Sequence, residues 1–108
     1  MSETSRLCRV DKFVVPDAAR EEFLQRVRET HQILRRQPGL VRDAILEQVG
    51  GPGRFNIVTI VEWESQLAID SARHAVMQAH AASGFDAHAI MQRLGIEADV
   101  AHYRELHD

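Results

Sequence analysis

The sequence predicts one α+β domain, in which a four-stranded antiparallel sheet carries its helices on one face. Residues 55–61 form a β-branched and aromatic run that is typical of a buried strand. The glycine-rich turn at residues 50–53 is too short for a crossover helix, so the strand before it pairs antiparallel. The remaining apolar patterns give the order strand, helix, strand, strand, helix, strand, which is the ferredoxin-like βαββαβ arrangement.

Composition limits the class of protein further. The 108 residues fit a single domain spanning 1–108, and 13 Lys and Arg against 16 Asp and Glu give no basic excess for binding nucleic acid. The single cysteine, Cys8, excludes an intrachain disulfide and lies in no zinc-ligand spacing, so we expect no metal. Because no apolar signal core or membrane-length run is present, we expect a soluble cytoplasmic protein with no membrane association.

The first two elements are predicted from residues 6–37. Residues 6–15 are rich in apolar side chains and form a strand that Pro16 closes. Asp17 is predicted to cap a helix that extends to about Gln37. The side chains that recur on one face of this helix are Ala19, Phe23, Val27, Thr30 and Leu34.

The dipeptide Pro38-Gly39 ends this helix, because proline disfavours the α conformation in the residue before it. Residues 40–49 then form a second strand, which its charged residues mark as more exposed than the third. Its two faces are predicted to carry Val41, Ile45 and Val49 on one side and Leu40, Ala44 and Leu46 on the other.

The second half of the chain follows the third strand. Ser65 is predicted to cap a helix, Gly84 to end it, Asp86 to cap a short helix at 87–94, and Gly95 to end that one. A last strand lies within residues 96–106. The inward stripe of the longer helix is predicted to consist of small residues, namely Ala68, Ala72, Ala75, Val76, Ala79 and Ala82.

The third strand is apolar on both faces, whereas the predicted helices cover one face of the sheet. A second copy of the chain is the economical cover for the other face. We therefore expect a homodimer in which two sheets pack face to face as a dimeric α/β barrel.

Three stretches are distinctive together: Phe-Val-Val-Pro at 13–16, Gln-Pro-Gly-Leu at 37–40, and above all Arg-Phe-Asn-Ile-Val-Thr-Ile-Val-Glu-Trp-Glu-Ser at 54–65. In these stretches the chain resembles the antibiotic biosynthesis monooxygenase domain of the dimeric α/β-barrel superfamily. It spans about residues 9–103. The resemblance implies a cofactor-independent monooxygenase that oxidises a phenol, quinol or polyketide-like aromatic between helices and sheet. Non-catalytic binding of a small aromatic molecule and haem binding or degradation remain as alternatives.

Oxygenation without metal or flavin needs an electron-rich substrate anion, so the protein has to bind an aromatic, remove a proton and exclude water. Trp63 is the candidate wall of such a site, although a lone tryptophan is equally typical of plain core packing. Thr59 and Phe55 share its strand parity and are candidate binding residues. Asn56 is the polar candidate that the family suggests, but parity places it on the opposite face, where a hydrogen-bonding or turn-proximal asparagine is the alternative.

Three further residues are candidates for catalysis. His31 lies at the edge of the buried stripe of the first helix, where it can face a cavity or the boundary with solvent. His74 lies close to the position where haem-degrading relatives place an iron ligand, but Arg73 holds that spacing and His74 leans outward. Tyr103, on the last strand, can donate to a substrate oxygen or pack as an edge aromatic. No histidine pair has metal-ligand spacing, and we expect no cofactor.

Overall fold

Four strands form one antiparallel sheet in the order β2-β3-β1-β4. The structure is a computed structural model that describes residues 6–106. The strands are β1 (Leu7–Val14), β2 (Leu40–Glu47), β3 (Ile57–Trp63) and β4 (Glu97–Tyr103). The two central strands therefore come from opposite halves of the chain, and β3 is flanked on both sides, as its apolar sequence predicts.

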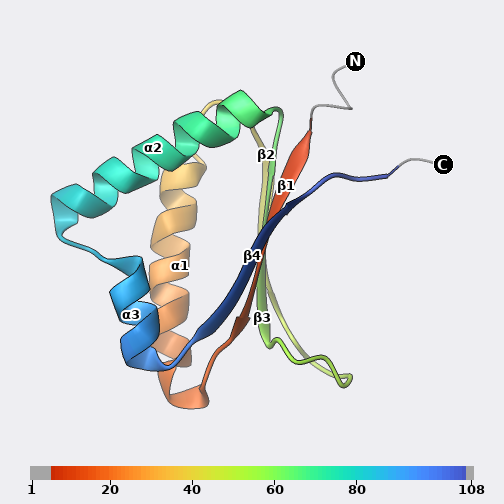
Figure 1. Cartoon of the computed structure of the whole chain (residues 1–108), viewed down its shortest axis with the longest axis vertical. Helices are drawn as coiled ribbons and strands as arrows, with labels where there is room; N and C mark the ends of the chain where they lie inside the picture. Colours follow the sequence, from red (N-terminus) through yellow and green to blue (C-terminus); the bar gives the residue numbers. More distant parts are fainter. Residues whose placement is uncertain (1–5, 107–108) are drawn as a thin grey trace.

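All the helices lie on the same face of the sheet (Figure 1). They are α1 (Arg20–Leu34), α2 (Gln66–Ser83) and α3 (Ala87–Leu94), with a 3₁₀ turn, η2 (Asp17–Ala19), before α1. The predicted ferredoxin-like α+β class and the short additional helix are confirmed. No helix within residues 6–106 combines the length and apolar character needed to cross a membrane.

The ends of α2 and α3 are determined by capping residues that the sequence identifies. The Ser65 hydroxyl accepts a hydrogen bond from the Ala68 amide at 3.2 Å, and the Asp86 carboxylate accepts one from the Ala89 amide at 3.1 Å. Gly84 and Gly95 end the two helices in the left-handed conformation, each with φ of 71°. These four predictions are confirmed.

The start of α1 differs from its prediction. Asp17 was expected to cap the helix, but it begins the 3₁₀ turn and its side chain makes no capping bond. The Ala19 amide instead donates to the Pro16 carbonyl at 2.9 Å, so the chain makes a tight turn before the helix proper begins at Arg20. The helix also ends at Leu34, earlier than the expected Gln37.

Alternation along β3 separates the two faces of the sheet. Ile57, Thr59, Val61 and Trp63 are buried, whereas the residues between them are half-buried. In the antiparallel register Thr59 lies opposite Asp11 of β1, so the buried parity of β3 and the odd-numbered residues of β1 share the face that the helices cover.

Strand β2 contains a bulge that the sequence analysis did not predict. Leu40 lies opposite Trp63 and Arg42 opposite Glu62, so Val41 is the extra residue in the ladder. Leu40 was expected on the same face as Ala44, but the bulge turns it toward the helices, where it packs near Trp63. The strand ends at Glu47 rather than at Val49, whose side chain is fully exposed.

The core consists of two clusters on the helix side of the sheet. One contains Phe13, Phe23 and Ile57, and the other contains Trp63, Ile69 and further residues of β3 and α2. The second cluster corrects the predicted stripe of α2, because Ile69 and Ala72 are its buried residues while Ala82 is exposed. The two clusters leave a cavity where they meet.

Candidate functional site

A cavity of about 290 Å³ lies between the sheet and the helices. Residues of both core clusters line it, including Phe13 and Phe23, whose rings meet edge to face with centroids 4.8 Å apart. An apolar cavity of about 150 Å³ already accepts benzene. The space therefore suits one or two fused aromatic rings.

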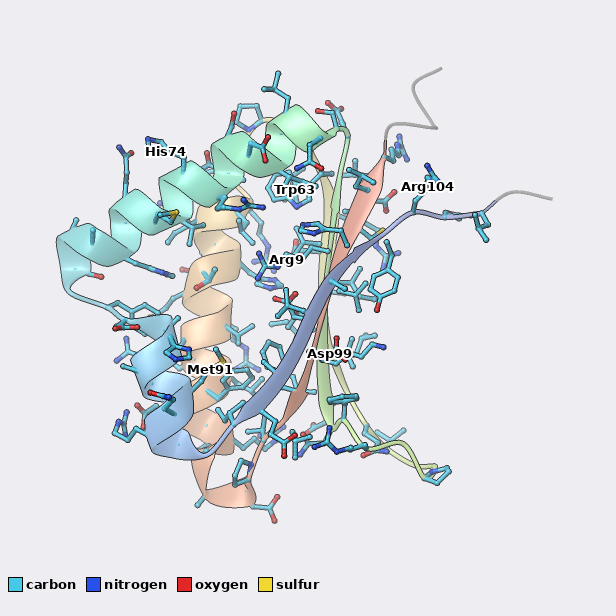
Figure 2. The ribbon with its side chains drawn as sticks, viewed as in Figure 1. Arg9, Trp63, His74, Met91, Asp99 and Arg104 are labelled. Carbon is cyan, nitrogen blue, oxygen red and sulfur yellow. The ribbon has the colours of Figure 1, made fainter. Side chains whose placement is uncertain are left out.

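Trp63 forms one wall of this cavity (Figure 2). It ends β3 on the helix-facing parity, and its side chain is 3% exposed. A buried indole offers a flat apolar surface together with one hydrogen-bond donor, the Nε1–H group. Trp63 therefore belongs to a core cluster and also lines the cavity, which are the two alternatives that the sequence left open.

Two polar groups face the cavity without a protein partner. Within residues 6–106, neither the Thr59 hydroxyl nor the Trp63 Nε1–H group has a hydrogen-bond partner. Every fully buried side-chain nitrogen and oxygen in the same part of the chain does have one. Both groups therefore retain some accessible surface, and both belong to residues that line the cavity.

His31 is the most buried titratable side chain at the cavity, with 4% of its surface exposed. Its Nδ1 atom lies 2.9 Å from the Oδ2 atom of Asp43. An ionised carboxylate can only accept a hydrogen bond, so Nδ1 donates and the neutral ring keeps its lone pair on Nε2. No residue in 6–106 bonds to Nε2, so this atom retains some accessible surface on a residue that lines the cavity.

Asp43 is kept ionised by a second partner. The Arg35 guanidinium donates from Nη2 to Oδ2 at 2.9 Å and from Nε to Oδ1 at 3.1 Å. These bonds to Arg35, followed by the bond from His31, hold the pKa of the Asp43 carboxyl below its ordinary value, although partial burial opposes them. An ionised Asp43 in turn fixes the orientation and tautomer of the His31 ring.

The bulge in β2 is what brings Asp43 to His31. Asp43 lies opposite Val61, on the helix-facing side of the sheet. Without the extra residue at Val41, a strand that starts with Leu40 opposite Trp63 would place Arg42 opposite Val61 and turn Asp43 to the other face. The one-residue insertion therefore determines which of two oppositely charged neighbours meets the histidine.

Arginines also line the cavity. Arg9 lies on the helix-facing side of β1 (Figure 2), with its Nε atom 3.0 Å from a carboxylate oxygen of Asp11. Arg26 of α1 and Arg73 of α2 line the cavity as well. These charged side chains are partly or largely exposed, so they mark where the cavity opens to solvent.

The structure brings His31, Thr59 and Trp63 to one cavity and leaves the other predicted site residues outside its lining. His74 projects from the outer side of α2, away from the sheet (Figure 2), and it is exposed. Tyr103, which is 44% exposed, lies opposite Cys8 in the register, on the face away from the helices.

The remaining two candidates precede β3. Asn56 uses its side-chain amide to extend the β1 ladder, with Oδ1 accepting from the Val15 amide and Nδ2 donating to the Val15 carbonyl, both at 2.8 Å. These bonds fit the alternative of a hydrogen-bonding asparagine, and the structure identifies the backbone of Val15 as the partner. Phe55 is half-buried beneath the Arg54 guanidinium, 5.3 Å from its ring centroid, and does not line the cavity.

Sequence reasoning missed Asp43, Arg9, Asp11 and His80, all of which lie at or beside the cavity. One pattern could have revealed two of them. Arg9 and Asp11 share strand parity with Leu7 and Phe13, so two charges interrupt an otherwise apolar face. His80 also lines the cavity, and its ring meets that of Phe85 with centroids 4.6 Å apart.

The residues at the cavity do not form a metal site. Across residues 6–106, no three His, Cys, Asp or Glu side chains are grouped so that they could hold a metal ion. The pair formed by His31 and Asp43 leaves one imidazole nitrogen without a protein partner within the same residues, and such a pair can act as a general base.

Comparison with known proteins identifies the same family on independent grounds. The family model described as antibiotic biosynthesis monooxygenase matches residues 7–92. Curated protein sequences gave no match.

Among solved structures, the cofactor-independent oxygenase SnoaB from Streptomyces nogalater shares 21% identity, with a TM-score of 0.71 and coverage of 96% of both chains. The haem-degrader MhuD from Mycobacterium tuberculosis, solved with two haems bound in its active site, shares 20% identity with a TM-score of 0.68, covering 94% of this chain and 97% of that one. At these identities the likeness shows the fold.

Proposed function

Because this chain belongs to the antibiotic biosynthesis monooxygenase family, we propose that it is a cofactor-independent monooxygenase. Its substrate is a small phenol that binds in the cavity and reacts there with O₂. The observation that carries the proposal is the buried His31 imidazole, held by Asp43 through Nδ1, with Nε2 open to an apolar cavity. The family contributes the reaction class, and the cavity contributes the groups that the reaction needs.

The reaction balances without an added reductant. A phenol with hydrogen on the ring carbon opposite its hydroxyl becomes a quinone: one atom of O₂ forms the new carbonyl, and the other leaves as water. The phenolic proton and the displaced ring hydrogen supply the two hydrogens of that water. The phenol is the electron donor, and it donates far more readily as the phenolate, so removal of its proton is the step that the protein assists.

His31 performs this step. Its Nε2 lone pair accepts the phenolic proton, and the resulting imidazolium is stabilised by the adjacent Asp43 carboxylate, 2.9 Å from Nδ1. Asp43 is a positioning residue in this scheme, because it acts through His31. Arg35 keeps Asp43 ionised and so preserves the tautomer that leaves Nε2 unprotonated.

Trp63 and Thr59 orient the ring. The indole face packs against the flat aromatic, while its Nε1–H and the Thr59 hydroxyl donate to a phenolate or quinone oxygen. The apolar walls around Phe13, Phe23 and Val61 exclude water, which strengthens these few polar contacts.

The test is oxygen uptake with a panel of phenols and naphthols that carry hydrogen on the ring carbon opposite the hydroxyl, comparing the natural chain with a His31→Gln variant. Glutamine keeps a polar side chain at the position but cannot take up the proton, so we expect kcat to fall about a hundredfold to ten-thousandfold. His88→Gln is the matched control, because His88 is exposed on α3 and does not line the cavity. Uptake by the natural chain that His31→Gln leaves unchanged contradicts the assigned base.

Two other functions are distinguished by the same set of measurements. If the protein binds aromatics without catalysis, the aromatics should bind with no oxygen uptake above the uncatalysed rate. Haem binding predicts a shifted Soret band when haem is added. No observation in this chain favours haem, since Arg73 holds the position ten residues beyond Trp63 where the family resemblance places the iron ligand, and His74 points away from the cavity.

The proposed enzyme is a homodimer formed through the uncovered face of the sheet (Figure 1). This face carries apolar residues of every strand, including Val10, Ala44, Val58, Ile60 and Ala101. Charges of both signs, including Lys12, Arg42 and Glu62, accompany them, so two copies can place opposite charges against each other. A pair that buries about 800 Å² per subunit is of ordinary size for a stable dimer.

Sedimentation velocity tests the dimer. Ile60 lies between Val10 and Ala44 in the register, near the middle of the face, so Ile60→Glu places two like charges in the interface and yields monomers. Leu67→Glu, at a 74% exposed position on α2, is the control and leaves the dimer intact. A natural chain that sediments as a monomer overturns the dimer.

A further inference from the structure

The charge of the cavity differs in sign from that of the whole chain. The chain carries a formal net charge of −3 at pH 7. Three arginines, Arg9, Arg26 and Arg73, line the cavity, whereas Asp11 is the one Asp or Glu among its lining residues. Because these arginines lie where the cavity opens to solvent, their excess positive charge attracts anions toward the opening.

Arg9 retains hydrogen-bond donors after it pairs with Asp11. The pair uses the Nε atom, which lies 3.0 Å and 3.2 Å from the two carboxylate oxygens. Neither terminal amino group of the guanidinium bonds to any residue in 6–106. Asp11 thus neutralises and orients Arg9, while the two Nη groups remain able to bind a planar anion.

Arg73 is the cation without a counter-charge. No carboxylate within residues 6–106 lies in salt-bridge range of it, although it is exposed on α2 and lines the cavity. Arg26, by contrast, pairs with Glu29 at 3.2 Å and lies 5.3 Å from the centroid of the Phe85 ring. Arg73 therefore contributes most of the uncompensated positive charge at the cavity.

We propose that the substrate is an anionic aromatic, a phenol that bears a carboxylate, and that Arg73 and the free amino groups of Arg9 bind this carboxylate. The inference rests on the proposed function, which places the phenol at His31. It adds a second recognition element to the cavity. An arginine pairs with a carboxylate through parallel N–H donors, which fixes the orientation of the ring as well as its affinity.

The volume of the cavity limits the size of this substrate. About 290 Å³ lies at the small end of the range of about 300–1,000 Å³ for small-molecule sites. One or two fused rings with a carboxylate fit this space. A naphthalene ring with a hydroxyl at one end and a carboxylate at the other is therefore a suitable probe.

Calorimetric titration under nitrogen measures binding without turnover. The two ligands are a hydroxynaphthoate, with its hydroxyl and carboxylate at opposite ends of the ring system, and the neutral analogue with a hydroxymethyl group in place of the carboxylate. We expect the anion to bind roughly tenfold more tightly. Raising the salt from about 0.1 M to about 1 M shortens the screening length from about 10 Å to about 3 Å and should reduce this preference.

Three variants identify which residues cause the tighter binding of the anionic ligand. Arg73→Met removes the unpaired cation but keeps most of the side-chain volume. The double variant Arg9→Met with Asp11→Asn removes the ion pair without changing the net charge. Arg36→Met is the control, because Arg36 is exposed at the end of α1 and does not line the cavity. Circular dichroism of each variant verifies that it is folded.

The proposal requires the ratio of the affinities for the anionic and the neutral ligand to fall toward one in Arg73→Met or in the double variant. The same ratio should stay unchanged in Arg36→Met. Equal binding of the two ligands by the natural chain overturns it, and so does a preference that survives in both cavity variants. These results leave the oxygenase proposal intact, because the neutral ligand still binds. Failure of both ligands to bind, with no oxygen uptake from any aromatic, overturns both proposals.

Discussion

Replacing Asp43 by asparagine perturbs the residue that connects His31 to the sheet. Asparagine keeps the shape and one acceptor oxygen, but it loses the charge and turns an amino group toward a donor. The side chains of His31 and Asp43 are 5% and 10% exposed, so water cannot replace the lost interaction. A bond of this kind is worth about 1–3 kcal/mol, whereas the Arg35 partner, 57% exposed, contributes little.

For a chain of this size, about 1 kcal/mol corresponds to roughly 4 °C in Tm, so we expect Asp43→Asn to melt about 4–12 °C lower than the natural chain. Thermal denaturation followed by circular dichroism measures this. The sign of its pH dependence follows from the pKa of Asp43, which the fold depresses. A depressed pKa stabilises the folded chain above the unfolded value, about pH 4, and this contribution is lost as the pH falls through the folded value.

The difference in Tm between the natural chain and Asp43→Asn should therefore narrow between about pH 5 and about pH 3. Glu47→Gln is the control, because its carboxylate pairs with Arg20 on the exposed surface and should matter little to Tm. The reasoning is refuted if Asp43→Asn melts with the natural chain near pH 5, or if the difference is as large near pH 3.

Two further predictions concern residues that support the site. Asn56→Ala removes two 2.8 Å hydrogen bonds to the backbone of Val15, so we expect the free energy of unfolding to fall by about 1–3 kcal/mol. Urea denaturation measures this loss, and aromatic binding should not weaken. Unchanged stability would contradict the idea that Asn56 holds the end of β1 in place. Gly39→Ala should cost more than Gly51→Ala: both glycines have φ of 89°, but a Cβ at Gly39 would lie 2.6 Å from Ala68 Cβ, whereas nothing lies within 4 Å of Gly51. Equal melting temperatures for these two variants would show that the close approach is not a constraint.

The sequence by itself determined the elements and their order. The apolar run of β3, the glycine turn before it and the caps at Ser65 and Asp86 all act through near neighbours along the chain, so a pattern in the sequence reveals them. Trp63 and Thr59 were placed on one buried face for the same reason, since alternation along a strand is local. The family resemblance adds the class of reaction, which the order of helices and strands does not indicate.

Only the tertiary structure decided what meets inside the cavity. His31 and Asp43 come from different elements, and they meet because the extra residue Val41 turns the side chain of Asp43 to the helix-facing side of the sheet. The sequence of β2 gives no local signal of this bulge. Arg9 enters the cavity because β1 is paired centrally in the sheet with this parity toward the helices. Register and the distance between layers are set by packing across the whole domain, and the chemistry of the site depends on both.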